Sequence, residues 1–266
     1  MPRPAISRVV TRLRRLRRAT RVGVAALRSP ASEAPNWARE ELGLSLLEQI
    51  ARRILPGYLV TEYGRSWQAD TDFLAAYRRL EPRSARSADR KFALTELLKL
   101  TVDIPGDTAE IGVFRGASSW FICHGTQGSE RTHYAVDSFA GLSQPSREDG
   151  DYWRPGDMRA AETDARNLLR DYNVEFVVGW IPAVLNELPE GPYAFVHVDV
   201  DLYEPTRAAF EFAYERMSPG GILLCDDYGF DTCPGARRAV DELMATRPEP
   251  VVHLPTGQGL VIRNRG

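Results

Sequence analysis

Cysteine is scarce in this chain of 266 residues, and its three cysteines, Cys123, Cys225 and Cys233, form no paired spacing. An odd, scattered set of this kind argues against a disulfide framework and against a zinc site. Because disulfides are rare in reducing compartments, a chain without them is expected in the cytoplasm. The sequence therefore predicts a cytoplasmic protein.

Long apolar runs are absent as well. No stretch approaches the roughly 20 apolar residues that a membrane-spanning helix needs. The apolar run at 22–27 is shorter than the core of a secretory signal, which takes about 7–15 residues. Hydrophobic residues still make up 43% of the chain and charged residues 26%, which favours a folded domain with a full core over a disordered chain.

Acidic residues are missing from the first 30 residues, which hold nine arginines. The rest of the chain has 25 basic against 36 acidic residues, a net charge of −11. An acidic body disfavours nucleic acid as a substrate. The apolar residues of 1–30 recur at helical spacing, so this segment is either a basic amphipathic helix in weak contact with an anionic membrane surface or a disordered extension. In both interpretations we expect it to be dispensable for chemistry.

Two patterns divide the remainder. Residues 31–100 show apolar residues at helical spacing with polar breaks and no strand pattern, which predicts an auxiliary helical region. From 101 to 266 strands and helices alternate, which predicts an α/β domain around a mostly parallel sheet with helices on both faces. The expected strands are 108–111, 134–137, 174–178, 193–201, 222–226, 251–254 and 259–263, and the expected helices are 117–124, 160–171, 205–217 and 235–246.

The turn after the first expected strand carries glycine, at the sheet edge where ligands of such folds bind. Glu110, Gly112 and Gly116 form an E-x-G-x-x-x-G pattern rather than the G-x-G-x-x-G of dinucleotide sites. The glycines let backbone approach a ligand, and the acid suits the cationic amino-acid end of S-adenosylmethionine. Asp137 ends the second expected strand, 25 residues after Gly112, where an acid can accept the hydroxyls of a ribose.

Four carboxylates lie at the ends of the fourth and fifth expected strands: Asp199 and Asp201, then Asp226 and Asp227. Parallel strands joined by one helix end at the same edge of the sheet, so these acids should converge. Like charges this close raise one another's pKa unless a cation neutralises them, and oxygen ligands alone suit Mg²⁺, Mn²⁺ or Ca²⁺. Since strand neighbours point to opposite faces, Asp226 and Asp227 can share one ion only if the chain leaves strand geometry there.

Motifs of other catalytic chemistries are absent or weak in the sequence. The sequence has no Ser/His/Asp arrangement and no G-x-S-x-G elbow. His197 lies within the fourth expected strand and is predicted to be buried and hydrogen-bonded, with a proton role left open by its proximity to Asp199. The polar loop 143–157 contains Tyr152 and Trp153 and is either a lid over a substrate or a plain surface loop.

Together these motifs resemble the macrocin O-methyltransferase family of metal-dependent sugar O-methyltransferases. The matching segments are 103–116, 137–142, 177–180, 199–206, 218–228 and 233–242. The resemblance implies a Rossmann-like class I methyltransferase fold with two sets of ligand-binding residues. S-adenosylmethionine would be bound by Glu110, Gly112, Gly116, Asp137, Ser138, Gly179 and Trp180, and Mg²⁺ or Mn²⁺ by Asp199, Asp226 and Asp227.

The implied acceptor is a sugar hydroxyl of a glycosylated natural product, or of an oligosaccharide such as a methylated mannoside. In this family the helical region helps to enclose the substrate and to build oligomers, so the resemblance also implies a homo-oligomer. Two positions depart from the family pattern, because Val200 replaces a glycine and Pro205 replaces a serine. Both departures leave the four acids in place and bear on the identity of the acceptor.

The expected chemistry is methyl transfer to an oxygen atom, with Asp199 as metal ligand and general base and Asp201 as the alternative base. Two other classes of function stay open at this point. A nicotinamide-dependent oxidoreductase shares the fold and an acid like Asp137, but it should show the third glycine. A non-catalytic scaffold with a methyltransferase-like fold would give no reason for four acids at strand ends.

Overall fold

The computed structural model describes residues 46–51, 53, 67, 69–81 and 87–265. The chain divides into two compact units, Met1–Ser66 and Trp67–Gly266. In the first unit residues 46–51 are helical, inside the region expected to be helical, whereas the basic extension 1–30 lies outside the described residues. Among the described residues, no helix is both long and apolar enough to span a bilayer.

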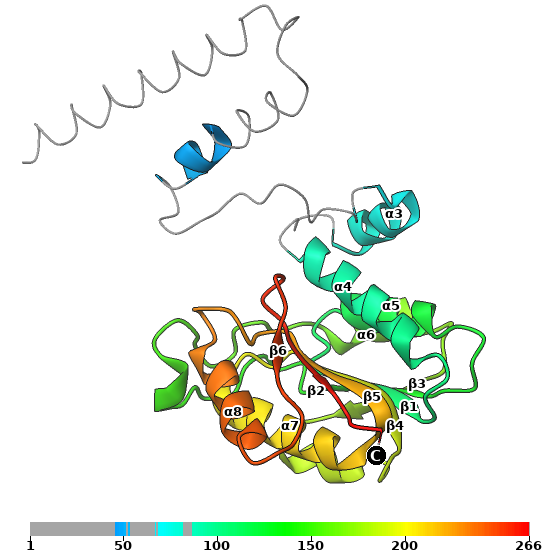
Figure 1. Ribbon diagram of the computed structural model, residues 1–266. Helices are drawn as coiled ribbons and strands as arrows, with labels where there is room; N and C mark the ends of the chain where they lie inside the picture. Colours follow the sequence, from blue (N-terminus) through cyan, green and yellow to red (C-terminus); the bar gives the residue numbers. More distant parts are fainter. Residues whose placement is uncertain (1–45, 52, 54–66, 68, 82–86, 266) are drawn as a thin grey trace, which may run out of the picture. The chain divides into compact units, whose positions relative to one another are not determined.

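The second unit is built on a sheet whose described strands have the order β3-β2-β1-β4-β5-β7-β6 (Figure 1). The five strands from β3 to β5 run parallel, and β7 and β6 add an antiparallel pair beside β5. The strands are β1 (Asp107–Ile111), β2 (His133–Asp137), β3 (Val174–Val178), β4 (Tyr193–Val198), β5 (Met217–Cys225), β6 (Val252–His253) and β7 (Gly259–Ile262). This confirms the mostly parallel, Rossmann-like α/β fold. The chain changes direction across the sheet between β1 and β4, which is where open sheets of this type bind ligands.

Helices cover both faces of the sheet (Figure 1). They are α3 (Thr71–Leu80), α4 (Ala88–Leu98), α5 (Ala117–Gly125), α6 (Glu162–Leu169), α7 (Tyr203–Arg216) and α8 (Pro234–Met244). Buried apolar residues of α3 to α6 pack in one cluster with Phe195 of β4, while those of α7 and α8 pack in another with Val196 and Val198. Because side chains alternate along a strand, β4 contributes to the hydrophobic core on both sides.

The helices α3 and α4 belong to the same compact unit as the sheet, although they precede residue 101. Phe73 of α3 packs with Phe92 of α4 and Phe121 of α5, at ring-centroid distances of 5.2 Å in both cases. Leu94 and Leu98 of α4 are buried in the cluster on this face. The helices α3 and α4 therefore complete one face of the sheet, and α4 reaches the carboxyl edge of the sheet.

Two expected boundaries differ from the structure by three residues or more. β4 ends at Val198, three residues before the predicted end, because Asp201 has a positive φ of 61° that no strand residue adopts. β5 begins at Met217, five residues before its expected start at 222. The pairing of β4 with β5 shifts register within these five residues, and Gly220 absorbs the irregularity with a φ of 86°.

Candidate active site at the carboxyl edge of the sheet

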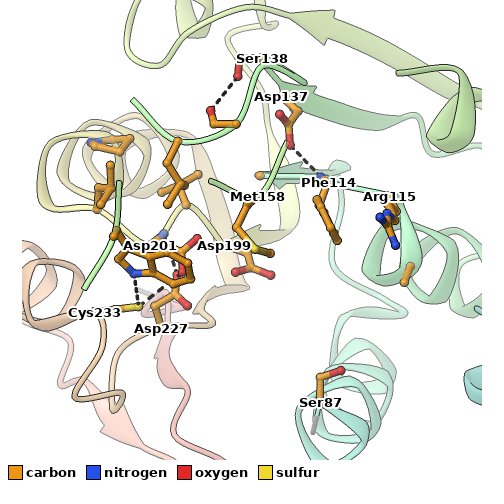
Figure 2. A pocket seen from close by; sticks show the side chains of 18 of the residues that line it. Ser87, Phe114, Arg115, Asp137, Ser138, Met158, Asp199, Asp201, Asp227 and Cys233 are labelled. Atoms are coloured by element: carbon orange, nitrogen blue, oxygen red, sulfur yellow. Dashed lines mark hydrogen bonds between the residues drawn. The ribbon is translucent and has the colours of Figure 1, made fainter. Parts of the chain in front are cut away.

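A cavity of about 850 Å³ opens at the carboxyl ends of β1 to β5 (Figure 2). This volume is in the upper part of the range for small-molecule sites, roughly 300–1,000 Å³. Eight of the eleven residues predicted to bind the donor or the metal or to act as the base line it: Gly112, Asp137, Ser138, Gly179, Trp180, Asp199, Asp201 and Asp227. The cavity therefore joins most of the expected donor residues to three of the four carboxylates.

Gly112 is required by the packing of two strand ends. Its φ is 98°, and a Cβ atom there would overlap the backbone carbonyl oxygen of Asp199. The amide of Gly112 also donates to the carbonyl oxygen of Val136 at 2.8 Å. Glycine at this position lets the ends of β1 and β4 approach each other, so its role includes placing Asp199 as well as leaving room for a ligand.

Asp137 is held rigidly at the end of β2. Its Oδ2 accepts hydrogen bonds from the amides of Val113 and Phe114 at 2.8 and 2.7 Å, and its Oδ1 accepts from the amide of Phe139 at 2.7 Å. A carboxylate has about four acceptor sites, two on each oxygen, so Oδ2 is fully used and Oδ1 keeps capacity for one further donor. Figure 2 shows Asp137 and Phe114 beside the cavity, as a ribose-binding role requires.

Glu110 and Gly116 do not line the cavity. The carboxylate of Glu110 is buried below β1, where it accepts hydrogen bonds from Ser119 and from His197. Alternation along β1 explains this direction, because Glu110 faces the α5 side of the sheet. Gly116 forms the N-cap of α5 with a φ of 84°, and a Cβ there would touch Ala165. The structure thus places both residues behind the predicted donor site rather than in contact with it.

The remaining predicted donor residues form a wall at the ends of β2 and β3. Ser138 donates from Oγ to the carbonyl oxygen of Gly141, and the amide of Gly179 donates to the carbonyl oxygen of Asp137. Trp180 has 45% of its surface exposed although it lines the cavity. An aromatic side chain left open inside a cavity provides an apolar surface for a ligand.

Asp199 and Asp201 follow β4 in a turn rather than in the strand. Asp199 accepts no side-chain hydrogen bond from the described residues. Asp201 is the middle residue of a tight turn in which the amide of Leu202 donates to the carbonyl oxygen of Val200 at 2.6 Å. The amide of Asp201 donates to Asp227 Oδ2 at 2.9 Å, which ties the end of β4 to the end of β5.

Asp226 and Asp227 leave strand geometry after Cys225, as the sequence requires for a shared site. Their carboxylates nevertheless have different surroundings. Asp226 is buried away from the cavity lining and accepts hydrogen bonds from Arg90, from Gln258 at 2.8 Å and from His197 at 3.2 Å. Asp227 faces the cavity (Figure 2). Among the described residues, Asp226 therefore groups with Asp199 and His197, whereas Asp227 groups with Asp201 and Cys233.

Burial and charge separate these acids into two electrostatic groups. Burial alone would raise the pKa of Asp226, but Arg90 and His197 outweigh it and hold that pKa well below its usual range. Burial lowers the pKa of His197, yet Asp226 and Glu110 outweigh it and raise the pKa to about 10, so both ring nitrogens carry protons. His197 is therefore buried and hydrogen-bonded, as predicted from the sequence.

At the acids that face the cavity, the neighbouring cations do not outweigh burial. Burial and the neighbouring charge of Asp226 raise the pKa of Asp199 to about 8. Burial, opposed by a hydrogen bond from Cys233, raises the pKa of Asp201 to about 6. Burial and the charges of Asp201 and Asp199 raise the pKa of Asp227 well above its usual value. The raised pKa values mean that these three carboxyl groups favour their protonated forms, and a bound cation would favour the ionised forms instead.

Comparison with known proteins agrees with this geometry. Residues 90–253 match the model of the macrocin-O-methyltransferase (TylF) family. The chain belongs to the macrocin-O-methyltransferase family. The 8-demethyl-8-(2,3-dimethoxy-alpha-L-rhamnosyl)-tetracenomycin-C 4'-O-methyltransferase of Streptomyces olivaceus is 30% identical over 191 residues, which span 65% of this chain and 69% of that protein. The demethyldecarbamoylnovobiocin O-methyltransferase of Streptomyces niveus is 29% identical over 201 residues, or 70% of this chain and 72% of that protein.

A solved structure shares the fold at lower identity. The crystal structure of the calicheamicin methyltransferase CalS11 superposes with a TM-score of 0.61 at 19% identity, covering 89% of this chain and 96% of that one. Since the relatives of this macrocin-O-methyltransferase family member are named O-methyltransferases, an enzyme with methyltransferase activity is the supported class. The relatives support neither a nicotinamide-dependent oxidoreductase nor a non-catalytic scaffold.

Two basic residues of the cavity in this family member were not predicted from the sequence. Arg90, in the first turn of α4, pairs with Asp226 and lies over the ring of Phe230 at 4.9 Å. Lys91 is buried and donates from Nζ to Ser118 Oγ at 3.0 Å. Both line the cavity. The signal in the sequence was the pair of adjacent basic residues at the start of an amphipathic helix, which usually indicates only a solvated helix face.

Proposed function

We propose that this chain is an S-adenosylmethionine-dependent and divalent-metal-dependent O-methyltransferase that acts on a sugar hydroxyl. The carrying observation is that one cavity borders both Asp137 and the carboxylates Asp199, Asp201 and Asp227. A donor held at the ends of β1 to β3 would then face, across one enclosed space, the acids that can activate a hydroxyl. The cavity volume of about 850 Å³ leaves room for an acceptor beside the donor.

The acceptor class follows from the relatives and from two departures in the sequence. The protein of Streptomyces olivaceus is named for methylating a rhamnosyl group of a tetracenomycin, which supports a sugar of a glycosylated natural product; an oligosaccharide such as a methylated mannoside is the second form of the same proposal. Val200 and Pro205, where this chain departs from the family pattern, both line the cavity. The departures therefore lie where they can adapt the site to its own acceptor.

Two of the three predicted metal ligands, Asp199 and Asp227, have carboxylate oxygens available for a divalent cation. The carboxylate of Asp199 accepts no hydrogen bond from the described residues, and Asp227 uses one oxygen for the amide of Asp201 and keeps the other. Asp226, the third predicted ligand, has to share its oxygens with Arg90, His197 and Gln258. All three provide hard oxygen atoms, as Mg²⁺ or Mn²⁺ prefers. When bound, such an ion would hold the acceptor hydroxyl and lower its pKa.

Asp199 is the proposed general base, because its oxygens are free to accept the hydroxyl proton. Asp201, the alternative base, already accepts a hydrogen bond from the thiol of Cys233 at 3.4 Å. As the new carbon–oxygen bond forms, the carbon–sulfur bond of the donor breaks and the hydroxyl proton passes to Asp199. The rigid carboxylate of Asp137 and the wall at Gly179 and Trp180 would align the donor for this in-line transfer, and such positioning contributes up to about 7–11 kcal/mol.

The direct test is methyl transfer from labelled S-adenosylmethionine to a panel of neutral glycosides and oligomannosides. We expect a methylated sugar, with turnover abolished by excess chelator and restored by Mg²⁺ or Mn²⁺. Binding of S-adenosylhomocysteine, followed by calorimetry, should survive chelation because the donor residues differ from the metal residues. Full turnover in excess chelator would exclude the metal mechanism, and no binding of S-adenosylhomocysteine would exclude the donor.

Asp137→Ala should weaken the binding of S-adenosylhomocysteine by about 1.5–3 kcal/mol for each charged hydrogen bond that is lost. The same change frees the amides of Val113 and Phe114, so Asp137→Asn is the matched control, because it keeps one acceptor oxygen and the shape of the side chain. Calorimetric titration measures both variants. Equal donor affinity in Asp137→Ala and in the unchanged protein would remove Asp137 from the donor site.

A further inference from the structure

The segment between β2 and α6 forms a closed loop at the mouth of the cavity. Its two ends are joined by backbone hydrogen bonds, from the amide of Leu142 to the carbonyl oxygen of Asp157 at 2.7 Å and from the amide of Gly156 to the carbonyl oxygen of Leu142 at 2.8 Å. We call residues 142–157 the aromatic loop, because Tyr152 and Trp153 lie within it. These bonds close the loop at its base, a few residues after the end of β2.

A buried aspartate fixes the middle of the aromatic loop to α7. Asp149 is only 2% exposed, and its Oδ1 accepts a hydrogen bond from the amide of Tyr203, the first residue of α7, at 2.6 Å. Its Oδ2 accepts from the amide and hydroxyl of Ser146 at 2.7 and 2.6 Å. A carboxylate at a helix N-terminus is favourable. The loop is therefore attached at its middle as well as at its base, unlike a lid that swings freely.

Trp153 connects the aromatic loop to the acidic cluster. Its indole Nε1 donates to Cys233 Sγ at 3.4 Å, and this thiol donates to Asp201 Oδ1 at 3.4 Å. Figure 2 shows Cys233 next to Asp201 and Asp227. The indole thus lies one thiol away from a carboxylate of the proposed reaction site, and its polar N–H is already satisfied. What it presents to the cavity that it lines is apolar ring surface.

Tyr152 extends this surface outward. Its ring stands edge-on to that of Trp153, with centroids 4.9 Å apart and an interplanar angle of 88°. The side chain is 63% exposed, yet it lines the cavity. No hydrogen bond of its hydroxyl to another described residue accounts for its position. A large aromatic side chain on a fixed loop, open toward a cavity, is suited to contact a ligand through its ring.

We propose that Tyr152 and Trp153 form the subsite for the sugar ring of the acceptor, and that this subsite selects a neutral sugar. The inference rests on the proposed function and adds the part of the site that recognises the acceptor. A pyranose seated against the two rings would direct a hydroxyl toward Asp199, since Trp153 is joined through Cys233 to Asp201 at the same edge. An acidic sugar would bring its charge beside Asp201 and Asp227, which buried like charges disfavour.

The test measures acceptor binding separately from donor binding. The probes are 4-nitrophenyl α-L-rhamnopyranoside as a neutral sugar and 4-nitrophenyl β-D-glucuronide as an acidic one, each titrated by NMR into protein saturated with S-adenosylhomocysteine. We expect the rhamnoside to bind at least about tenfold more tightly than the glucuronide. Tyr152→Ala should weaken rhamnoside binding about three- to tenfold, and Tyr152→Phe should retain it because the ring remains.

Leu100→Ala is the matched control, because Leu100 is also an exposed apolar residue, at 57%, and does not line the cavity. It should leave the rhamnoside affinity unchanged. The affinity for S-adenosylhomocysteine should be equal in all variants, which separates this proposal from the proposed function. Equal rhamnoside binding in Tyr152→Ala, a preference for the glucuronide, or no rhamnoside binding by protein that binds S-adenosylhomocysteine would overturn the subsite. Protein that does not bind S-adenosylhomocysteine would overturn the proposed function and the subsite that rests on it.

Discussion

Asp199→Asn is expected to lower kcat by about 10²–10⁴-fold, the usual contribution of a general base, while the affinity for S-adenosylhomocysteine stays unchanged. Asparagine has nearly the same shape but cannot take up the hydroxyl proton, and it is a weaker ligand for a divalent cation. The substitution is informative because Asp199 accepts no side-chain hydrogen bond from the described residues. No structural bond is lost with the charge, so the folded state should be at least as stable as before.

The comparison with two neighbouring acids sharpens this test. Asp201→Asn should cost less than Asp199→Asn if Asp199 is the base, whereas the reverse order would assign the proton to Asp201. Asp227→Asn should resemble partial metal loss, with a higher concentration of Mg²⁺ or Mn²⁺ needed for half-maximal turnover. The measurements are single-turnover rates at saturating donor and a metal titration of each variant. A kcat of Asp199→Asn within a factor of ten of the unchanged enzyme would contradict both of its proposed roles.

Gly112→Ala is expected to destabilise the fold by about 2–4 kcal/mol and to lower kcat/KM by at least about 10²-fold. The added Cβ would overlap the backbone carbonyl oxygen of Asp199, so either β1 or the end of β4 has to move. Displacement of Asp199 by about 1 Å is enough for a loss of this size. Denaturant unfolding measures the stability, and initial rates measure kcat/KM.

Gly128→Ala is the matched control for Gly112→Ala. Gly128 has a similar positive φ of 87°, but a Cβ there would meet no atom within 4 Å. It should therefore show only the cost of the unfavourable backbone conformation, about 1 kcal/mol, with unchanged turnover. If both variants lost the same stability and activity, the collision with Asp199 would not be the cause.

The parts of the fold that could be predicted from sequence are those with a strong local pattern. β3 was predicted with its observed bounds, and α5 with an error of one residue, because apolar periodicity and a glycine turn mark their ends. The end of β4 was predicted three residues too late. Val200 continues the apolar run, and nothing in the letters of the sequence reveals that Asp201 adopts a positive φ.

The candidate site was predictable to a similar degree, for a related reason. Topology alone places Asp199, Asp201 and Asp227 at one edge of the sheet, and the structure agrees. The partners of Asp226 were not predictable, because Arg90 lies 136 positions upstream and no spacing rule connects the two. Alternation along β1 sets the direction of Glu110, but its partners Ser119 on α5 and His197 on β4 were not predictable, because only the packed structure brings them together.

The attachment of α4 to the sheet also has a consequence for recombination between relatives. A chimaera joined at residue 101 would combine an α4 from one parent with the acids of another, and it would separate Arg90 from Asp226 and Lys91 from Ser118. An unmatched partner would leave a buried charge without its counterion, which is strongly destabilising. With a crossover ahead of Trp67, at the boundary between the two compact units, both residues of each pair come from the same parent. Chimaeras designed to exchange acceptor preference between relatives should therefore be joined at that boundary.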